Sequence, residues 1–116
     1  AAAEALAFPQ SYFDDLARDY RERRDLLAAA LRETGFGVHL PRGAYYIMTD
    51  ISGLTRKDDV SFAMELVSQG GVACVPGSSF FLDPADGRAI VRFCFAKKRA
   101  TLERAAIVLR ERLGAR

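Results

Sequence analysis

Eight residues near the end of the chain constrain its fold more than any other segment. Residues 89–96 read Ala-Ile-Val-Arg-Phe-Cys-Phe-Ala, and seven of them are apolar. Such a density of β-branched and aromatic side chains predicts a buried strand. Because side chains alternate along a strand, Arg92 shares its face with Ile90 and Cys94. The opposite face is wholly apolar and carries Ala89, Val91, Phe93 and Phe95.

Arg92 needs a partner, because a guanidinium on an otherwise apolar face is costly unless it is paired or solvated. Its planar fork matches a carboxylate through two hydrogen bonds. The partner can be an Asp or Glu of this chain or an anionic ligand. Structural ion pairs outnumber functional ones, so the residue type taken without further context favours the first alternative.

Size and charge bound the remaining possibilities. The chain has 116 residues, half of them hydrophobic, which predicts one domain with a real core. The net charge of +2 is spread along the chain and indicates neither nucleic acid nor an anionic membrane as the main partner. The sequence contains no run of about 18 apolar residues, so no membrane span is predicted. Residues 1–8 do not resemble a signal peptide, and we expect a cytoplasmic protein.

The metal-binding and thiol residues are few. Cys74 and Cys94 both fall in predicted strands, where they are interpreted as small core residues in a reducing compartment rather than as a disulfide. His39 is the one histidine. Without a Cys/His cluster around it, the sequence argues against zinc, and we expect no metal site.

The first predicted helix is long for so small a domain. Ser11 is a plausible N-cap, and helical spacing of apolar residues continues to about Thr34, with Gly35 as the C-terminal stop. Before it, an alanine-rich segment without an initiator Met reads like the end of an earlier helix, interrupted by Pro9. We therefore expect residues 1–10 to be the tail of a preceding segment in a longer polypeptide.

Strands and helices alternate along the rest of the chain, and this order predicts an α+β fold. We expect a small, mostly antiparallel sheet of three to four strands with helices packed on one face, in which the last two strands form a long-looped hairpin. The predicted strands are 37–40, 44–50, 72–75 and 89–96; one further helix is capped by Thr55 or Asp58 and ends at Gly70-Gly71, and the last begins near Thr101.

Three segments, taken together, are similar to one family. They are Gly-Ala-Tyr-Tyr at 43–46, Gly-Val-Ala-Cys-Val-Pro-Gly-Ser-Ser-Phe at 71–80 and Val-Arg-Phe-Cys-Phe-Ala at 91–96. In this order and spacing they resemble the C-terminal small domain of class I/II, fold-type-I pyridoxal-phosphate-dependent aminotransferases. The local sequence around Arg92 looks most similar to the methionine, glutamine and kynurenine aminotransferase branch. The resemblance implies that residues 11–116 form that small domain.

The resemblance also implies roles for individual residues. In such enzymes the arginine of this strand binds the α-carboxylate of the substrate, which here would be Arg92. Gly77, Ser78 and Phe80 look like the loop that closes over the substrate, although Phe80 could equally be a core residue. The parent enzyme would be a homodimer that moves an amino group between an amino acid and a 2-oxo acid. Tyr46 is interpreted as packing rather than chemistry.

The lysine that such an enzyme needs for its cofactor has no obvious counterpart. The chain contains Lys57 in a predicted loop and Lys97-Lys98 in a polar link, and none lies in a setting that lowers a lysine pKa. The resemblance places the cofactor lysine in a large domain preceding residue 1. We therefore expect this chain by itself to be inactive and not to bind pyridoxal phosphate.

Two other classes of function remain open from the residues. The chain could be an autonomous α+β module that binds an acidic small metabolite through Arg92 without catalysis. It could also be a structural fragment that only dimerises.

Overall fold

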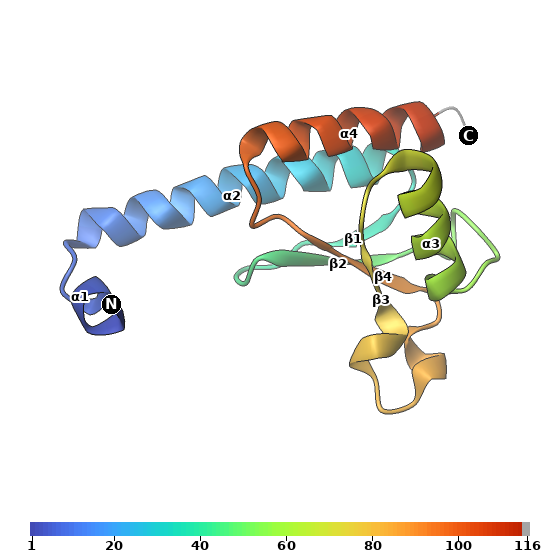
Figure 1. Cartoon of the computed structure of the whole chain (residues 1–116), viewed down its shortest axis with the longest axis horizontal. Coiled ribbons are helices and arrows are strands. Elements are labelled where there is room, and N and C mark those ends of the chain that lie inside the picture. The colour runs from blue at the N-terminus through green and yellow to red at the C-terminus, as the bar shows by residue number, and fades with distance from the viewer. Residues whose placement is uncertain (115–116) are drawn as a thin grey trace.

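The computed structural model describes residues 1–114, which form an α+β fold with one sheet at its centre (Figure 1). The elements follow in the order α1 (Ala2–Leu6), α2 (Gln10–Glu33), β1 (Gly37–His39), β2 (Tyr46–Asp50), α3 (Asp59–Gly70), β3 (Val75–Pro76), the 3₁₀ helices η1 (Gly77–Phe80) and η2 (Pro84–Gly87), β4 (Ile90–Cys94) and α4 (Arg99–Leu113).

Within the described residues the sheet has four strands in the order β1-β2-β4-β3, and every neighbouring pair is antiparallel. The α+β class predicted from the sequence is confirmed, and so is the hairpin between the last two strands, β3 and β4. Arg92 on β4 is flanked by Met48 of β2 and Val75 of β3. It therefore occupies a central position of the sheet rather than an edge.

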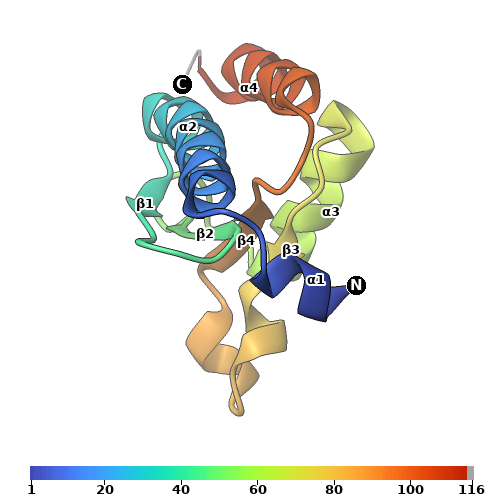
Figure 2. The same ribbon diagram turned by 90° about the vertical axis from the view of Figure 1, so that its left-hand side faces the viewer.

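Helices α2, α3 and α4 cover one face of the sheet, as expected from the sequence (Figures 1 and 2). The core between the helices and the sheet includes Val91 and Phe93, the apolar face of the strand identified first. The Phe36 ring packs edge-on against the rings of Phe62 and Phe93. The buried hydroxyl of Thr49 donates a 2.8 Å hydrogen bond to the Val91 carbonyl oxygen, so this polar group in the core is satisfied.

The helix boundaries differ from the prediction by one or two residues at several ends. Helix α2 begins at Gln10 with Pro9 as N-cap, so the Ser11 cap is wrong; the proline fixes an extended backbone that leads into the helix. Gly35 has φ +99° and is the predicted stop. The last helix begins at Arg99, two residues before the predicted Thr101.

All four strands are shorter than predicted; β1 ends one residue early, at His39, and β4 spans only Ile90–Cys94 of the predicted residues 89–96. The strand predicted at 72–75 is wrong for most of its length, since only Val75 and Pro76 pair with β4. The strand predicted at 44–50 begins at Tyr46, because Ala44 has φ +61° and does not lie in the extended region. Apolar composition signals burial, as at Val72, but it does not guarantee ladder pairing.

The first half of α2 extends beyond the sheet (Figure 1). Residues 10–19 of this helix are all exposed, whereas its buried residues lie near its C-terminal end. Within residues 1–114, no helix has the length and apolar character needed to cross a membrane.

Candidate functional site: the Arg92 face of the sheet

Arg92 projects from the face of the sheet opposite the helices. Its neighbours on that face are partly exposed, in contrast to the buried Val91 and Phe93 of the core face. Tyr46 of β2 and Phe80 of η1 contact its guanidinium: the guanidinium carbon lies 4.7 Å from the Tyr46 ring centroid and 4.3 Å from the Phe80 ring centroid. Such cation–π contacts hold a guanidinium in place without consuming its N–H donors.

The structural ion pair considered for Arg92 is not found in the part of the chain that the structure describes. Within residues 1–114, no Asp or Glu carboxylate lies within 4.0 Å of the Arg92 guanidinium nitrogens, and no hydrogen bond to a main-chain carbonyl compensates its charge. Other arginines do have such partners; Arg24, for example, reaches both Asp25 and the Pro41 carbonyl. The fork of Arg92 therefore remains available for an external carboxylate.

The predicted loop residues Gly77, Ser78 and Phe80 all belong to η1, which lies with η2 on the side of the sheet away from α2 and α4 (Figure 1). The structure brings Phe80 to Arg92, while Gly77 is buried and Ser78 is partly buried. Gly77 permits a close approach to backbone: a Cβ there would lie 2.5 Å from the Ile90 carbonyl oxygen. The absence of a side chain at Gly77 thus lets η1 pack against the Ile90 backbone of the same chain.

Sequence reasoning missed two contributors to this site. Tyr46 was interpreted as packing, yet its ring contacts the Arg92 guanidinium. The antiparallel register explains it, since Tyr46 and Met48 point to the same face of the sheet as Arg92. The second is Asp59, whose buried carboxylate accepts a 2.7 Å hydrogen bond from the Ser78 backbone N–H of η1. No local feature of the sequence distinguishes this acid from the neighbouring Asp58, which caps the helix.

The cysteines are both free thiols, as interpreted from the sequence. Burial raises the pKa of the Cys74 thiol to about 12. A thiol that stays protonated at neutral pH is a poor nucleophile and metal ligand, so Cys74 is a packing residue.

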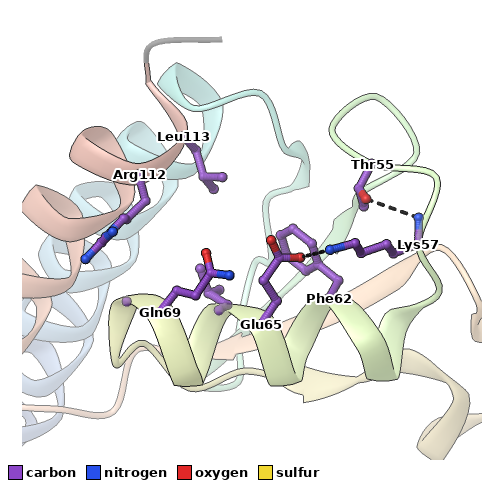
Figure 3. A pocket seen from close by; sticks show the side chains of 9 residues that line it. Thr55, Lys57, Phe62, Glu65, Gln69, Arg112 and Leu113 are labelled. Carbon is purple, nitrogen blue, oxygen red and sulfur yellow. Dashed lines mark hydrogen bonds and ion pairs between the residues drawn. The ribbon is translucent and has the colours of Figure 1, made fainter.

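The three lysines of the chain, Lys57, Lys97 and Lys98, lie in two different settings. The Lys57 ammonium pairs with the Glu65 carboxylate at the side of a pocket of about 380 Å³ between α3 and the end of α4 (Figure 3). Lys97 and Lys98 are exposed before α4.

The comparison with protein families covers nearly the whole chain. The family of class I and II aminotransferases matches residues 1–109. The chain belongs to this family. This confirms the resemblance drawn from the segments around Tyr46, Gly77 and Arg92.

Individual relatives agree with that assignment. The methionine aminotransferase of Escherichia coli is 37% identical over 111 residues, which cover 96% of this chain and 28% of that protein. A probable N-succinyldiaminopimelate aminotransferase of Mycobacterium tuberculosis is 39% identical over 114 residues, covering 90% of this chain and 28% of the relative. The solved structure of N-succinyldiaminopimelate aminotransferase from Mycobacterium tuberculosis matches with a TM-score of 0.82 at 36% identity, over 93% of this chain and 28% of that one. This aminotransferase-family chain thus spans about 28% of the length of these relatives.

Proposed function

We propose that this chain is the substrate-carboxylate-binding C-terminal small domain, residues 11–116, of an aminotransferase that moves an amino group between an amino acid and a 2-oxo acid. Arg92 binds the α-carboxylate shared by both substrates through its two-pronged fork. Residues 1–10 belong to the segment that precedes the domain. The parent enzyme is a cytoplasmic homodimer.

One observation carries the proposal for Arg92. Its guanidinium is held by the rings of Tyr46 and Phe80, yet no carboxylate of residues 1–114 neutralises it. A guanidinium that is fixed in direction but unpaired is preorganised for an anionic ligand, because little side-chain freedom is lost when the ligand binds.

The cofactor chemistry belongs to the rest of the protein in this proposal. Pyridoxal phosphate would supply the electron sink for amino-group transfer, and it needs a lysine that this chain does not offer. The chain covers about 28% of its relatives. A large domain from the remaining length would provide the lysine and the phosphate site, so this chain without it would be inactive.

The test is Arg92→Lys in the full-length enzyme, with Arg56→Lys in an exposed loop as the matched control. Lysine keeps the charge and loses the fork, so kcat/KM should fall by more than about tenfold, equivalent to about 1.4 kcal/mol, for every amino-acid substrate alike. Thermal stability should remain close to that of the control.

An Arg92→Lys enzyme that unfolds while its folded fraction keeps normal kinetics would show a structural role for the arginine and contradict the assignment. If the full-length protein transfers no amino group but still binds a carboxylic acid through Arg92, the non-catalytic binding module is correct.

A further inference from the structure

Asp59 is unusual among the charged residues of 1–114, since it is the one that is buried, with 3% of its surface exposed. A buried carboxylate is costly unless it is hydrogen-bonded. Asp59 Oδ2 accepts the Ser78 backbone N–H at 2.7 Å. The carboxylate is therefore directed away from its own helix and toward η1, across 19 positions of sequence.

The capping of α3 does not explain Asp59. The N-cap is Asp58, whose Oδ1 accepts the Ser61 N–H at 2.8 Å. An acid in the first turn of a helix is favourable through the helix dipole, but that effect is available to an exposed side chain as well. The burial of Asp59 and its hydrogen bond to Ser78 thus indicate a role other than capping α3.

The residue that Asp59 holds is two positions from the Arg92 contact. Ser78 and Phe80 both lie in the four-residue η1, whose first residue, Gly77, packs directly against the Ile90 backbone. A bond that fixes the Ser78 N–H fixes the first turn of η1. The position of the Phe80 ring, 4.3 Å from the guanidinium carbon of Arg92, depends on the same turn.

We propose that Asp59 is a positioning residue for the carboxylate site: its buried side chain holds η1 so that Phe80 stays against Arg92. The significance of this contact for substrate rests on the proposed function of Arg92. With Phe80 in place, the guanidinium keeps one direction before the carboxylate arrives. Without it, the arginine must be ordered during binding, which weakens affinity.

The test compares neighbouring acids in the 116-residue chain. Asp59→Ala removes the acceptor for the Ser78 N–H, whereas Asp59→Asn keeps an amide oxygen that can accept it. Asp58→Ala is the matched control, because it removes a hydrogen bond of the same kind that does not involve η1. Phe80→Leu removes the ring itself and serves as the positive control.

The readout is the Nε–H signal of Arg92 in ¹⁵N spectra, assigned by its loss in Arg92→Lys. A ring that faces the guanidinium displaces this signal from the position of a free arginine. Asp59→Ala and Phe80→Leu should both move it, while Asp58→Ala and Asp59→Asn should leave it near the wild-type position. A signal unmoved by Asp59→Ala but moved by Phe80→Leu would overturn the positioning role.

Titration with acetate, the simplest carboxylate, separates the two proposals. The apparent Kd read from the Arg92 signal should rise by about two- to fivefold in Asp59→Ala, the size expected for loss of an exposed cation–π contact. It should recover in Asp59→Asn. If acetate does not affect Arg92 even in the wild type, the carboxylate proposal fails, while the signal position still decides whether Asp59 orders Phe80.

A variant that fails to fold does not prevent the test. Hydrogen exchange of the Ser78 amide can be measured in the wild-type chain, where the bond to Asp59 should protect it. A Ser78 amide that exchanges as fast as in an unstructured peptide would overturn the proposal.

Discussion

Gly77 and Gly87 pack so closely that neither has room for a side chain. A Cβ on Gly77 would lie 2.7 Å from the Gly87 carbonyl oxygen, and one on Gly87 would lie 2.3 Å from the Gly77 carbonyl carbon. Both glycines are buried. The contact joins η1 to η2 and thereby supports the segment that presents Phe80 to Arg92.

Gly77→Ala and Gly87→Ala should each destabilise the fold, because the obstructing atoms belong to backbone and cannot rotate away. We expect a loss of about 1–3 kcal/mol, the usual cost of overpacking. Gly43→Ala is the control, since a Cβ there meets no atom within 4 Å. Urea unfolding measures all three. Equal stabilities of the Gly43 and Gly77 variants would show that the η1–η2 contact relaxes at little cost.

Much of the fold could be predicted from the sequence because its signals are local. Alternation in residues 89–96 located the Arg92 face and the core face, and glycines 35 and 71 marked the ends of α2 and α3. The strand predictions were wrong where pairing depends on residues that are distant in the sequence. Val72 is buried, as its apolar character indicated, but a strand needs a neighbour at the right register, and β3 finds it only from Val75.

The sequence singles out Arg92 as a candidate site residue, but it does not identify the side chains that contact it. An arginine among apolar residues is conspicuous in the sequence, because burying an unpaired guanidinium costs free energy. The contact between Tyr46 and Arg92, by contrast, depends on the register of β2 against β4. Asp59 gives no local signal that separates it from the Asp58 cap. Its role arises from a hydrogen bond to Ser78, and such a bond is fixed by tertiary structure.

The ion pair of Lys57 and the exposure of Lys97 and Lys98 predict how the chain responds to pyridoxal phosphate. After incubation with the cofactor and reduction with borohydride, peptide mapping should find no lysine labelled to stoichiometry. Low labelling spread over all three would agree with exposed amines of ordinary reactivity. A single lysine modified completely and selectively would contradict the view that the cofactor site belongs to another part of the protein.

The partly buried thiol of Cys74 predicts a loss of stability in alkaline solution. Its pKa is raised from 9.0 to about 12 in the folded chain, so the unfolded chain releases the thiol proton first as pH rises. Stability from the protonated thiol is fully present below pH 9.0 and is lost as pH approaches 12. Between about pH 8 and about pH 10.5, wild type should lose roughly 2 kcal/mol more than Cys74→Ala, measured by urea unfolding. Parallel pH profiles would contradict this.

The exposed half of α2 and the preceding segment predict self-association of the 116-residue chain. Several large apolar side chains gather there, namely Leu6 (83% exposed), Phe8 (43%), Tyr12 (44%), Phe13 (37%) and Leu16 (40%). Such a patch usually marks an interaction surface, and in our proposal the rest of the enzyme covers it.

Without that cover, we expect the chain to sediment as more than a monomer and to bind a hydrophobic dye. Replacing both Phe13 and Leu16 by Gln should shift it toward the monomer, because the patch then loses its centre. Val60→Gln with Ile107→Gln is the matched control, since these side chains are 50% and 55% exposed but lie on α3 and α4. Sedimentation velocity at several concentrations distinguishes the variants. If the wild-type chain sediments as a monomer and binds no hydrophobic dye, the first half of α2 drives no association. The same conclusion follows if the control pair reduces association as much as the Phe13 and Leu16 replacements.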